Sequence, residues 1–364
     1  MSVVPWLSEP RARNQEANVR QLTKVVALAA GAVLALSACG GSDDDGDTAA
    51  EPSGSSGGSL KIGMAFDVGG RGDGTFNDLA VQGLEELKSS EGAEITELSP
   101  NTDGTNRDAL LRQLADDGYN PIVGVGFAYG EAIDTVAKEY PDTQFVRIDG
   151  GPSTESNVAV KTFKEEQGSY LVGVAAALKT KTKHVGFIGG NESQLITKFY
   201  AGFVQGVKSV DPSIKIDEKR LAAGEDTAGF GNTTGARVAA EAMYQAGADI
   251  IYTAAGGSWG GSFPAAAAAK KLAIGVDSDQ YNTVGDPALQ KVIMTSMLKR
   301  VDTAVLAGVK EFKETKKITN ESYGLDKDGV GYATSGGGVD DVKTQLEAAK
   351  AKIVSGEIKV AETA

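Results

Sequence analysis

The sequence predicts an α/β protein of two lobes, each built from a parallel β-sheet flanked by helices. From residue 60 onward, short apolar runs alternate with helical patterns of roughly 10–15 residues, which is the order that βαβ units produce. This alternation pauses after residue 178 and begins again at 184, so we expect two similar lobes rather than one long sheet. Nearly every apolar run also ends in glycine or polar residues, and open parallel sheets bind ligands at that end of their strands.

In the first half of the chain, strands are predicted from short apolar runs and helices from apolar residues at helical spacing. The stretch 76–89, for example, carries Leu79, Leu84 and Leu87. We expect strands at 60–66, 121–125 and 144–149, and helices at 76–89, 106–117, 130–140 and 165–178.

The second half repeats this rhythm. We expect strands at 184–189, 215–221, 249–254 and 273–276, a further strand leading to Lys299, and helices at 198–210, 235–246 and 264–271. Excluding the first 59 residues leaves roughly 300, enough for two lobes of ordinary domain size.

The N-terminal segment predicts export and a lipid anchor. Basic residues precede an apolar run at 25–36 that is too short to cross a bilayer comfortably. The block Leu-Ser-Ala-Cys that ends at Cys39 resembles a bacterial lipobox, in which the cysteine becomes the lipidated N-terminus. We therefore expect a signal peptide at 1–38, a flexible Gly/Ser/Asp tether at 39–59, and diacylglycerol and palmitate on Cys39 at the outer face of the cell membrane. The alternative is an ordinary secretory signal with an incidental cysteine.

Composition excludes several classes of function. The formal charge of −13 disfavours phosphate backbones and anionic headgroups, so we expect no nucleic-acid partner and membrane attachment through the lipid alone. Cys39 is the only cysteine, which excludes a disulfide. The only histidine is His184, which argues against a zinc or other transition-metal site and against any Ser-His-Asp triad not centred on it. We interpret His184, at the start of a predicted strand, as a surface or strand-edge histidine.

The loop after the first predicted strand, 67–77, carries the first candidate ligand contacts. Its glycines lack the G-x-G-x-x-G spacing of a dinucleotide site. Phe76 and Asn77 begin a helix directly after a strand end, where an aromatic face and an amide suit a flat heterocycle. The alternative is a capping loop whose Phe76 packs into the core.

Asp277 and Lys299 follow strands of the second half and form the next candidates. A carboxylate at a strand end can accept two hydrogen bonds from a vicinal diol, as in ribose, and Lys299 can add a donor. The alternative is a turn and a solvated surface lysine. Because no nucleophile has an evident base, we expect no catalytic residue and no enzyme activity.

Six short segments in a fixed order resemble the basic membrane lipoprotein (BMP) family, also called purine nucleoside receptor A-like proteins. They are 66–67 (FD) with 76–77 (FN), 136–142 (VAKEYPD) before 148–149 (ID), 168–173 (GSYLVG), 186–190 (GFIGG), 254–257 (AAGG) and 275–280 (GVDSDQ), with Lys299 after them. The resemblance covers about 60–331. It implies a substrate-binding lipoprotein of an ABC importer with the type I periplasmic-binding-protein fold and a ligand cleft between the lobes.

The resemblance also implies a set of ligand-binding residues. Phe76 and a second aromatic residue would stack on a purine; for the second we prefer Phe263 over Trp259 and Phe199. Polar contacts would come from seven further residues: Asp67, Asn77 and Asp149 at the base edge, and Asp277, Lys299, Gly256 and Gly257 at the ribose.

Three segments depart from the family pattern. The first loop is rich in glycine and contains Arg71, Trp259 stands where the family usually has a small residue, and 230–232 (FGN) replaces a segment that often contains an aspartate. These departures bear on the identity of the ligand rather than on the fold.

The resemblance implies the following organisation and partners. The first lobe would comprise 60–162 plus 294–318, and the second 163–292 plus 319–364. A monomer without metal or other cofactor would capture adenosine, guanosine or inosine by hinge closure between the lobes and deliver it to an ABC permease. Two alternatives stay open: an extracytoplasmic sensor of the same fold, and a binding protein for a sugar or another small polar solute. A nucleoside hydrolase would need a dense aspartate motif after the first strand, which the sequence lacks.

Overall fold

The computed structural model describes residues 60–363, which belong to one compact unit. The predicted signal peptide at 1–38, the lipidated Cys39 and the tether at 39–59 lie outside the described residues. Between residues 60 and 363, no helix combines the length and the apolar character that a bilayer crossing needs.

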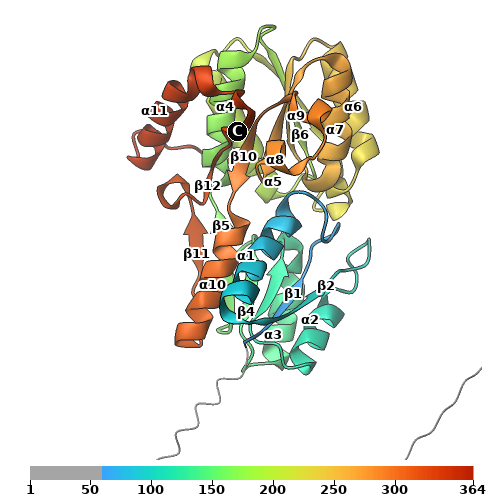
Figure 1. Cartoon of the computed structure of the whole chain (residues 1–364), viewed down its shortest axis with the longest axis vertical. Helices are drawn as coiled ribbons and strands as arrows, with labels where there is room; N and C mark the ends of the chain where they lie inside the picture. The colour runs from blue at the N-terminus through green and yellow to red at the C-terminus, as the bar shows by residue number, and fades with distance from the viewer. Residues whose placement is uncertain (1–59, 364) are drawn as a thin grey trace, which may run out of the picture. The chain divides into compact units, whose positions relative to one another are not determined.

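Two six-stranded sheets form the framework (Figure 1). The first has the order β11-β5-β4-β3-β1-β2 and the second β12-β10-β9-β8-β6-β7. Every neighbouring pair is parallel except β10 and β12. The strands are β1 (Lys61–Ala65), β2 (Glu94–Leu98), β3 (Ile122–Val125), β4 (Phe145–Ile148), β5 (Val158–Phe163), β6 (His184–Gly189), β7 (Lys215–Arg220), β8 (Ile250–Ala254), β9 (Leu272–Asp277), β10 (Ile293–Lys299), β11 (Glu321–Tyr323) and β12 (Val330–Tyr332). The predicted α/β class with two helix-flanked parallel sheets is confirmed.

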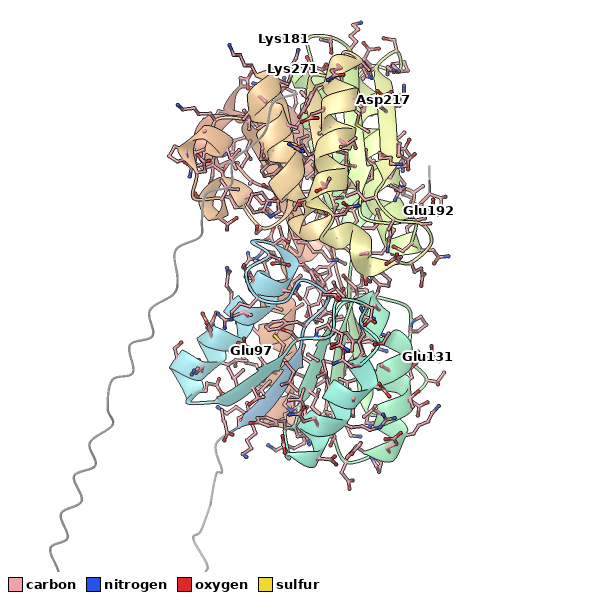
Figure 2. The ribbon with its side chains drawn as sticks, turned by 90° about the vertical axis from the view of Figure 1, so that its right-hand side faces the viewer. Glu97, Glu131, Lys181, Glu192, Asp217 and Lys271 are labelled. Carbon is pink, nitrogen blue, oxygen red and sulfur yellow. The ribbon has the colours of Figure 1, made fainter. Side chains whose placement is uncertain are left out.

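Helices cover both sheets, as parallel strands buried on both faces require. The first lobe carries α1 (Phe76–Glu91), α2 (Arg107–Asp116), α3 (Gly130–Glu139) and α10 (Val301–Thr315). The second lobe carries α4 (Glu165–Lys179), α5 (Gln194–Val210), α6 (Thr233–Gln245), α7 (Trp259–Ala269), α8 (Gln280–Thr283), α9 (Pro287–Gln290) and α11 (Lys343–Val354). In the side view of Figure 2, acidic side chains lie on the outer surfaces of both lobes, Glu97 and Glu131 on the first and Glu192 and Asp217 on the second.

Two glycines of α5 allow it to pack directly on α4. A Cβ atom at Gly202 would collide with the carbonyl oxygen of Glu166, and one at Gly206 with that of Tyr170. Because glycine has no side chain, the two helices cross with their backbones in contact. This close crossing fixes the first turns of α5, which include Phe199, beside the point where the chain enters the second lobe.

Two helices begin a full turn or more earlier than the sequence predicted. α5 begins at Gln194 instead of 198, because the hydroxyl of Ser193 caps it by accepting the N–H of Ile196. α7 begins at Trp259 instead of 264. Gly261 lies so close to the backbone of α6 that any side chain would collide with Thr233, so tertiary packing outweighs the poor helix propensity of the glycines.

The predicted division of the chain between the lobes is wrong at the return segment 294–318. β10 pairs with β9 and β12 and therefore belongs to the second sheet, whereas β11 pairs with β5 in the first. Only α10, which packs on α1, returns to the first lobe as expected. The chain thus passes between the lobes three times: from β5 to α4, from β10 to α10 and from β11 to β12.

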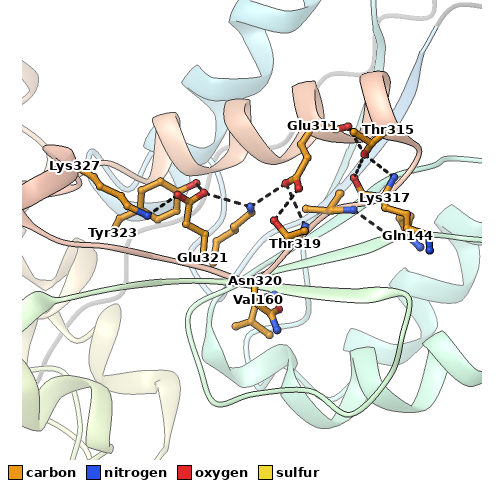
Figure 3. Close-up of polar contacts among 12 residues, drawn as sticks. Gln144, Val160, Glu311, Thr315, Lys317, Thr319, Asn320, Glu321, Tyr323 and Lys327 are labelled. Atoms are coloured by element: carbon orange, nitrogen blue, oxygen red, sulfur yellow. Dashed lines mark hydrogen bonds and ion pairs between the residues drawn. The ribbon is translucent and has the colours of Figure 1, made fainter.

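A buried lysine, Lys161, holds the last return of the chain to the first lobe through Glu311 and Glu321, which are labelled in Figure 3. The ammonium of Lys161 on β5 lies 3.4 Å from Glu311 and 3.8 Å from Glu321. Next to it, the side chain of Asn320 accepts the backbone N–H of Val160 at 2.7 Å. These contacts attach the end of α10 and the short β11 to the edge of the first sheet.

Candidate ligand-binding site

A cavity of about 250 Å³ lies between the two lobes, where the carboxyl ends of both sheets meet. Residues that follow β1 and β4 line it from the first lobe, and the last residues of β9 and β10 line it from the second. Of the predicted site residues, Asp67, Phe76, Asn77, Asp149, Gly256, Gly257, Asp277 and Lys299 line this cavity. The topology brings them together because parallel strands direct their following loops to one edge.

Phe263, the preferred second stacking residue, is not part of the cavity. It is fully buried in the core of the second lobe, 5.5 Å from Trp259 between ring centroids. Because α7 already begins at Trp259, Phe263 lies one turn inside the helix and faces the core instead of the cleft. Of the other two residues considered, Trp259 does not line the cavity, and Phe199 does.

Aromatic rings reach the cavity from both lobes. Phe76 is the first residue of α1 and Phe199 belongs to α5, and the ammonium of Lys299 lies 5.2 Å and 5.6 Å from their ring centroids. Phe127 from the first lobe and Phe230 from the second form an edge-to-face pair with centroids 6.3 Å apart. The cavity therefore offers flat apolar surfaces, a preferred environment for an aromatic ligand.

Lys299 is the centre of a buried ion cluster that joins the lobes. Its ammonium lies 2.7 Å from Asp149 of the first lobe and 3.1 Å from Glu165 at the start of α4 in the second. Burial acts to lower the pKa of Lys299, but the carboxylates of Asp149, Glu165 and Asp277 outweigh it and hold this pKa above its ordinary value. Lys299 therefore stays protonated, and Asp149 and Glu165 already occupy part of the hydrogen-bonding capacity of its ammonium group.

Asp277 differs from the other carboxylates because it has no protein donor. It is buried, and no group within residues 60–363 donates a hydrogen bond to its side chain. Its backbone lies in the left-handed region with φ 63°, as does that of Asp149 with φ 71°, a conformation that aspartate tolerates and that is frequent at functional sites. Burial, with Asp149, Asp73 and Glu165 adding to it and Lys299 opposing it, raises the pKa of Asp277 to about 7.

Asn77 and Asp73 form a network that sequence reasoning described only in part. The Asn77 side-chain oxygen accepts the N–H of Asp67 at 3.0 Å, and its amide donates to Asp73 at 3.1 Å. Asp73 also accepts the backbone N–H groups of Thr75 and Asn77, both at 2.9 Å, and so caps α1. We did not predict Asp73 as a cavity residue, and its local sequence signal is weak, because it lies two positions before the N-cap residue Thr75.

The glycine-rich loop and Trp259, both departures from the family pattern, contact each other across the lobes. The indole N–H of Trp259 donates to the carbonyl of Asp73 at 2.9 Å. The hydroxyl groups of Ser278 and Thr283 donate to the carbonyl of Gly74 at 2.7 Å and 3.3 Å. The lobes therefore touch at the mouth of the cavity, as in a closed arrangement.

Residues 60–364 match the model of the Bmp family, described as ABC transporter substrate-binding protein PnrA-like. The chain belongs to this family. Among its Bmp-like relatives, a Lactococcus lactis protein named ABC transporter nucleoside-binding protein BmpA is 32% identical and covers 94% of this chain and 99% of its own. A CD4+ T-cell-stimulating antigen of Listeria innocua is 36% identical and covers 92% and 96%. Relatives from three Pyrococcus species are named lipoproteins.

Among solved structures, an ABC transporter solute-binding protein from Aeropyrum pernix is similar, with a TM-score of 0.70 and 27% identity over 82% of this chain and 92% of that one. The predicted resemblance and fold class are thus confirmed. The Bmp family member is an ABC transporter substrate-binding protein, a transport component that binds a small molecule and acts with a membrane permease.

Proposed function

We propose that this Bmp family member captures purine nucleosides in the cavity between its lobes and delivers them to its permease. The observation that carries this proposal is the buried Asp277 carboxylate, which faces a cavity with aromatic rings from both lobes and has no donor among the described residues. A ligand with a vicinal diol and a flat base satisfies both features. The name of the Lactococcus lactis relative, nucleoside-binding protein, supports the same ligand class.

The ribose would bind at the second lobe. Asp277 would accept hydrogen bonds from both ribose hydroxyl groups, since an ionised carboxylate is an acceptor only. Lys299 lies beside it and can donate to a hydroxyl or the ring oxygen, and Gly256 and Gly257 expose backbone at the cavity wall. A ligand without the diol would leave a buried charge unpaired, which is costly.

The base would lie between the lobes. Phe76 and Phe199 would stack on its two faces, with Phe199 in the place that the sequence analysis gave to Phe263. Asp67, Asn77 and Asp149 would read its edge. The amide of Asn77 can donate only one further hydrogen bond, because its other N–H is used by Asp73.

The charge of the cavity favours nucleosides over nucleotides. Four carboxylates line it, those of Asp67, Asp73, Asp149 and Asp277, against the single ammonium of Lys299. A phosphate group would be repelled by this excess of negative charge.

Three further features of the proposal concern the whole protein. A lipid on Cys39 would hold the monomer at the outer face of the membrane, and the three connections between the lobes would act as a hinge. Closure would remove the nucleoside from water, and the contacts of Trp259 with Asp73 would belong to the closed form.

Binding to a panel of ligands tests the proposed function. The soluble body from residue 59 onward is titrated calorimetrically with adenosine, guanosine, inosine, cytidine, guanosine monophosphate, guanine and ribose. We expect binding of the purine nucleosides, weaker binding of guanine, and none of ribose or the nucleotide. At a hundred times its Kd, a nucleoside should raise the free energy of unfolding by about 2.7 kcal/mol. Binding of sugars alone would contradict the proposal.

Replacing Phe199 by leucine should weaken nucleoside binding about tenfold or more, because leucine keeps the apolar volume but lacks the aromatic face that stacks on the base. Phe263→Leu is the matched control, since it should lower the free energy of unfolding by about 1–3 kcal/mol and leave the nucleoside Kd unchanged. Calorimetric titration and urea unfolding of both variants separate the two roles. If Phe263→Leu weakened nucleoside binding and Phe199→Leu left the nucleoside Kd unchanged, Phe263 would be the stacking residue.

A further inference from the structure

Arg107 lies behind the cavity and contacts one of its carboxylates. It is the first residue of α2, does not line the cavity, and its guanidinium lies 3.3 Å from Oδ1 of Asp67. Only 13% of the Arg107 side chain and 10% of the Asp67 side chain are exposed. Arg107 is thus the counterion of a buried, ligand-facing aspartate.

The surroundings of Arg107 fix its position. Its guanidinium donates to the carbonyl of Gly104 at 3.1 Å and lies 5.6 Å from the ring centroid of Tyr129. The hydroxyl of Tyr129 donates at 2.8 Å to the carbonyl of Phe66, the residue before Asp67. Arg107 and Tyr129 therefore hold the side chain and the backbone of the same short segment.

The two oxygens of Asp67 have different environments. Oδ1 accepts the N–H of Val68 at 2.8 Å and a hydrogen bond from Arg107. Oδ2 has no donor among the described residues and lies against Gly126, where a Cβ atom would collide with it. Arg107 thus occupies one oxygen and leaves the other for a ligand.

We propose that Arg107 is a positioning residue that keeps Asp67 ionised, with Oδ2 directed at the base, so that the site prefers purines with a ring N–H. This inference rests on the proposed nucleoside site. Guanosine and inosine carry N1–H, which a carboxylate accepts, whereas adenosine presents N1 as an acceptor and is matched only by a protonated carboxyl group.

Three titratable or charged groups face Asp67: Arg107 on α2, Asp149 after β4 and Tyr129 after β3. Burial raises the pKa of Asp67, Asp149 raises it further and Arg107 lowers it. Removing Arg107 therefore removes the one group that favours the ionised form through its charge. Protonation of Asp67 would then begin at a higher pH than in the unchanged protein.

The test compares Arg107→Met with Arg107→Lys by calorimetric titration of inosine and adenosine between pH 5.5 and 8. The readout is the ratio of the two Kd values, from which the pH dependence of shared ribose contacts cancels. We expect Arg107→Met to raise the inosine-to-adenosine Kd ratio about tenfold at pH 7 and more at pH 5.5, because one neutralised ion-pair partner typically changes selectivity by about 1.4 kcal/mol or more. Arg107→Lys should restore part of the preference.

Asp67→Asn provides a second variant with the same readout. By itself, Asp67→Asn should change the inosine-to-adenosine Kd ratio. Adding Arg107→Met to Asp67→Asn should change this ratio no further, because position 67 then carries no negative charge for Arg107 to stabilise. If the wild type binds purine nucleosides and neither Arg107→Met nor Asp67→Asn alters the ratio, the inference is wrong and the proposed function stands. If the wild type binds no purine nucleoside, both are wrong.

Discussion

Asp277→Asn is expected to lower the affinity for purine nucleosides by about 10²–10³-fold, the value of two hydrogen bonds to a charged acceptor. In the proposed complex the carboxylate would accept hydrogen bonds from both ribose hydroxyl groups, whereas the amide of asparagine offers one acceptor and one donor that opposes a hydroxyl proton. Asp279→Asn is the matched control, because Asp279 lies two residues away, does not line the cavity and should leave the Kd unchanged. Calorimetric titration measures both variants. An unchanged nucleoside Kd in Asp277→Asn would show that the ribose does not bind at Asp277.

Asp277 should also make nucleoside binding depend on pH. Burial raises the pKa of Asp277 to about 7, and the proposed ligand would bind the ionised form. Affinity should therefore fall about tenfold for each pH unit below 7 and level off above it. Asp277→Asn should remove this dependence. A flat wild-type profile from pH 5 to 8 would show that Asp277 is already ionised throughout.

Ionisation of Asp277, which should favour ligand binding, should lower the stability of the ligand-free protein. As pH rises from 4 to 7, the unfolded chain loses the proton of Asp277 before the folded protein does, which lowers the free energy of unfolding. Asp277→Asn should therefore be more stable than the wild type by about 2–4 kcal/mol at pH 8, with the difference vanishing near pH 4. Urea unfolding at both pH values measures this difference. The ionised Asp277 carboxylate would thus lower the free energy of unfolding of the free protein while strengthening the binding of the proposed ligand.

Lys299→Met should produce the largest loss of stability, about 3–5 kcal/mol in the free energy of unfolding. The substitution keeps much of the apolar stem but leaves Asp149 and Glu165 buried side by side without their cation. Urea unfolding at pH 7 gives the magnitude. The double variant Lys299→Met/Glu165→Gln should recover part of the loss, because one unpaired charge is removed with the lysine.

Lys161→Met is the matched control for this prediction. Lys161 is equally buried, but the side chains of its partners Glu311 and Glu321 are 27% and 33% exposed, so water can solvate them when the cation is removed. We expect a loss of about 1–2 kcal/mol. Equal losses in the two variants would mean that the Lys299 cluster is no more sensitive than an ordinary half-exposed ion pair.

Lys299 also explains how ligand capture and lobe closure can be linked. Its ammonium bridges Asp149 of the first lobe and Glu165 of the second and lies near the aromatic rings of Phe76 and Phe199. A ligand between these rings would complete a cluster that already spans both lobes. The lobes are therefore joined by Lys299 inside the cavity as well as by the contact of Trp259 with Asp73.

The sequence alone predicted the α/β class and most of the strands and helices because a buried parallel strand and an amphipathic helix each leave a local pattern. All but one of the ligand-contact residues that it predicted line the cavity, since residues at the carboxyl ends of parallel strands meet at one edge whatever the details of packing. Asp67, Asp149 and Asp277 were recognisable for this reason. Four strands were missed. β11 and β12 are only three residues long, β2 is only half-buried, and β5 is interrupted by Lys161, whose burial depends on glutamates 150 and 160 residues away.

Only the tertiary structure decided which aromatic residue lines the cavity and which charges pair. A helix start that differs by five residues turns Phe263 into the core and leaves Phe199 at the cavity, and that start depends on the packing of Gly261 against α6. The pairing of Lys299 with Asp149 and Glu165, of Arg107 with Asp67, and the absence of a partner for Asp277 likewise join segments far apart in the chain. Local sequence patterns report burial and periodicity, whereas the distance between two side chains on different elements is set by how those elements pack.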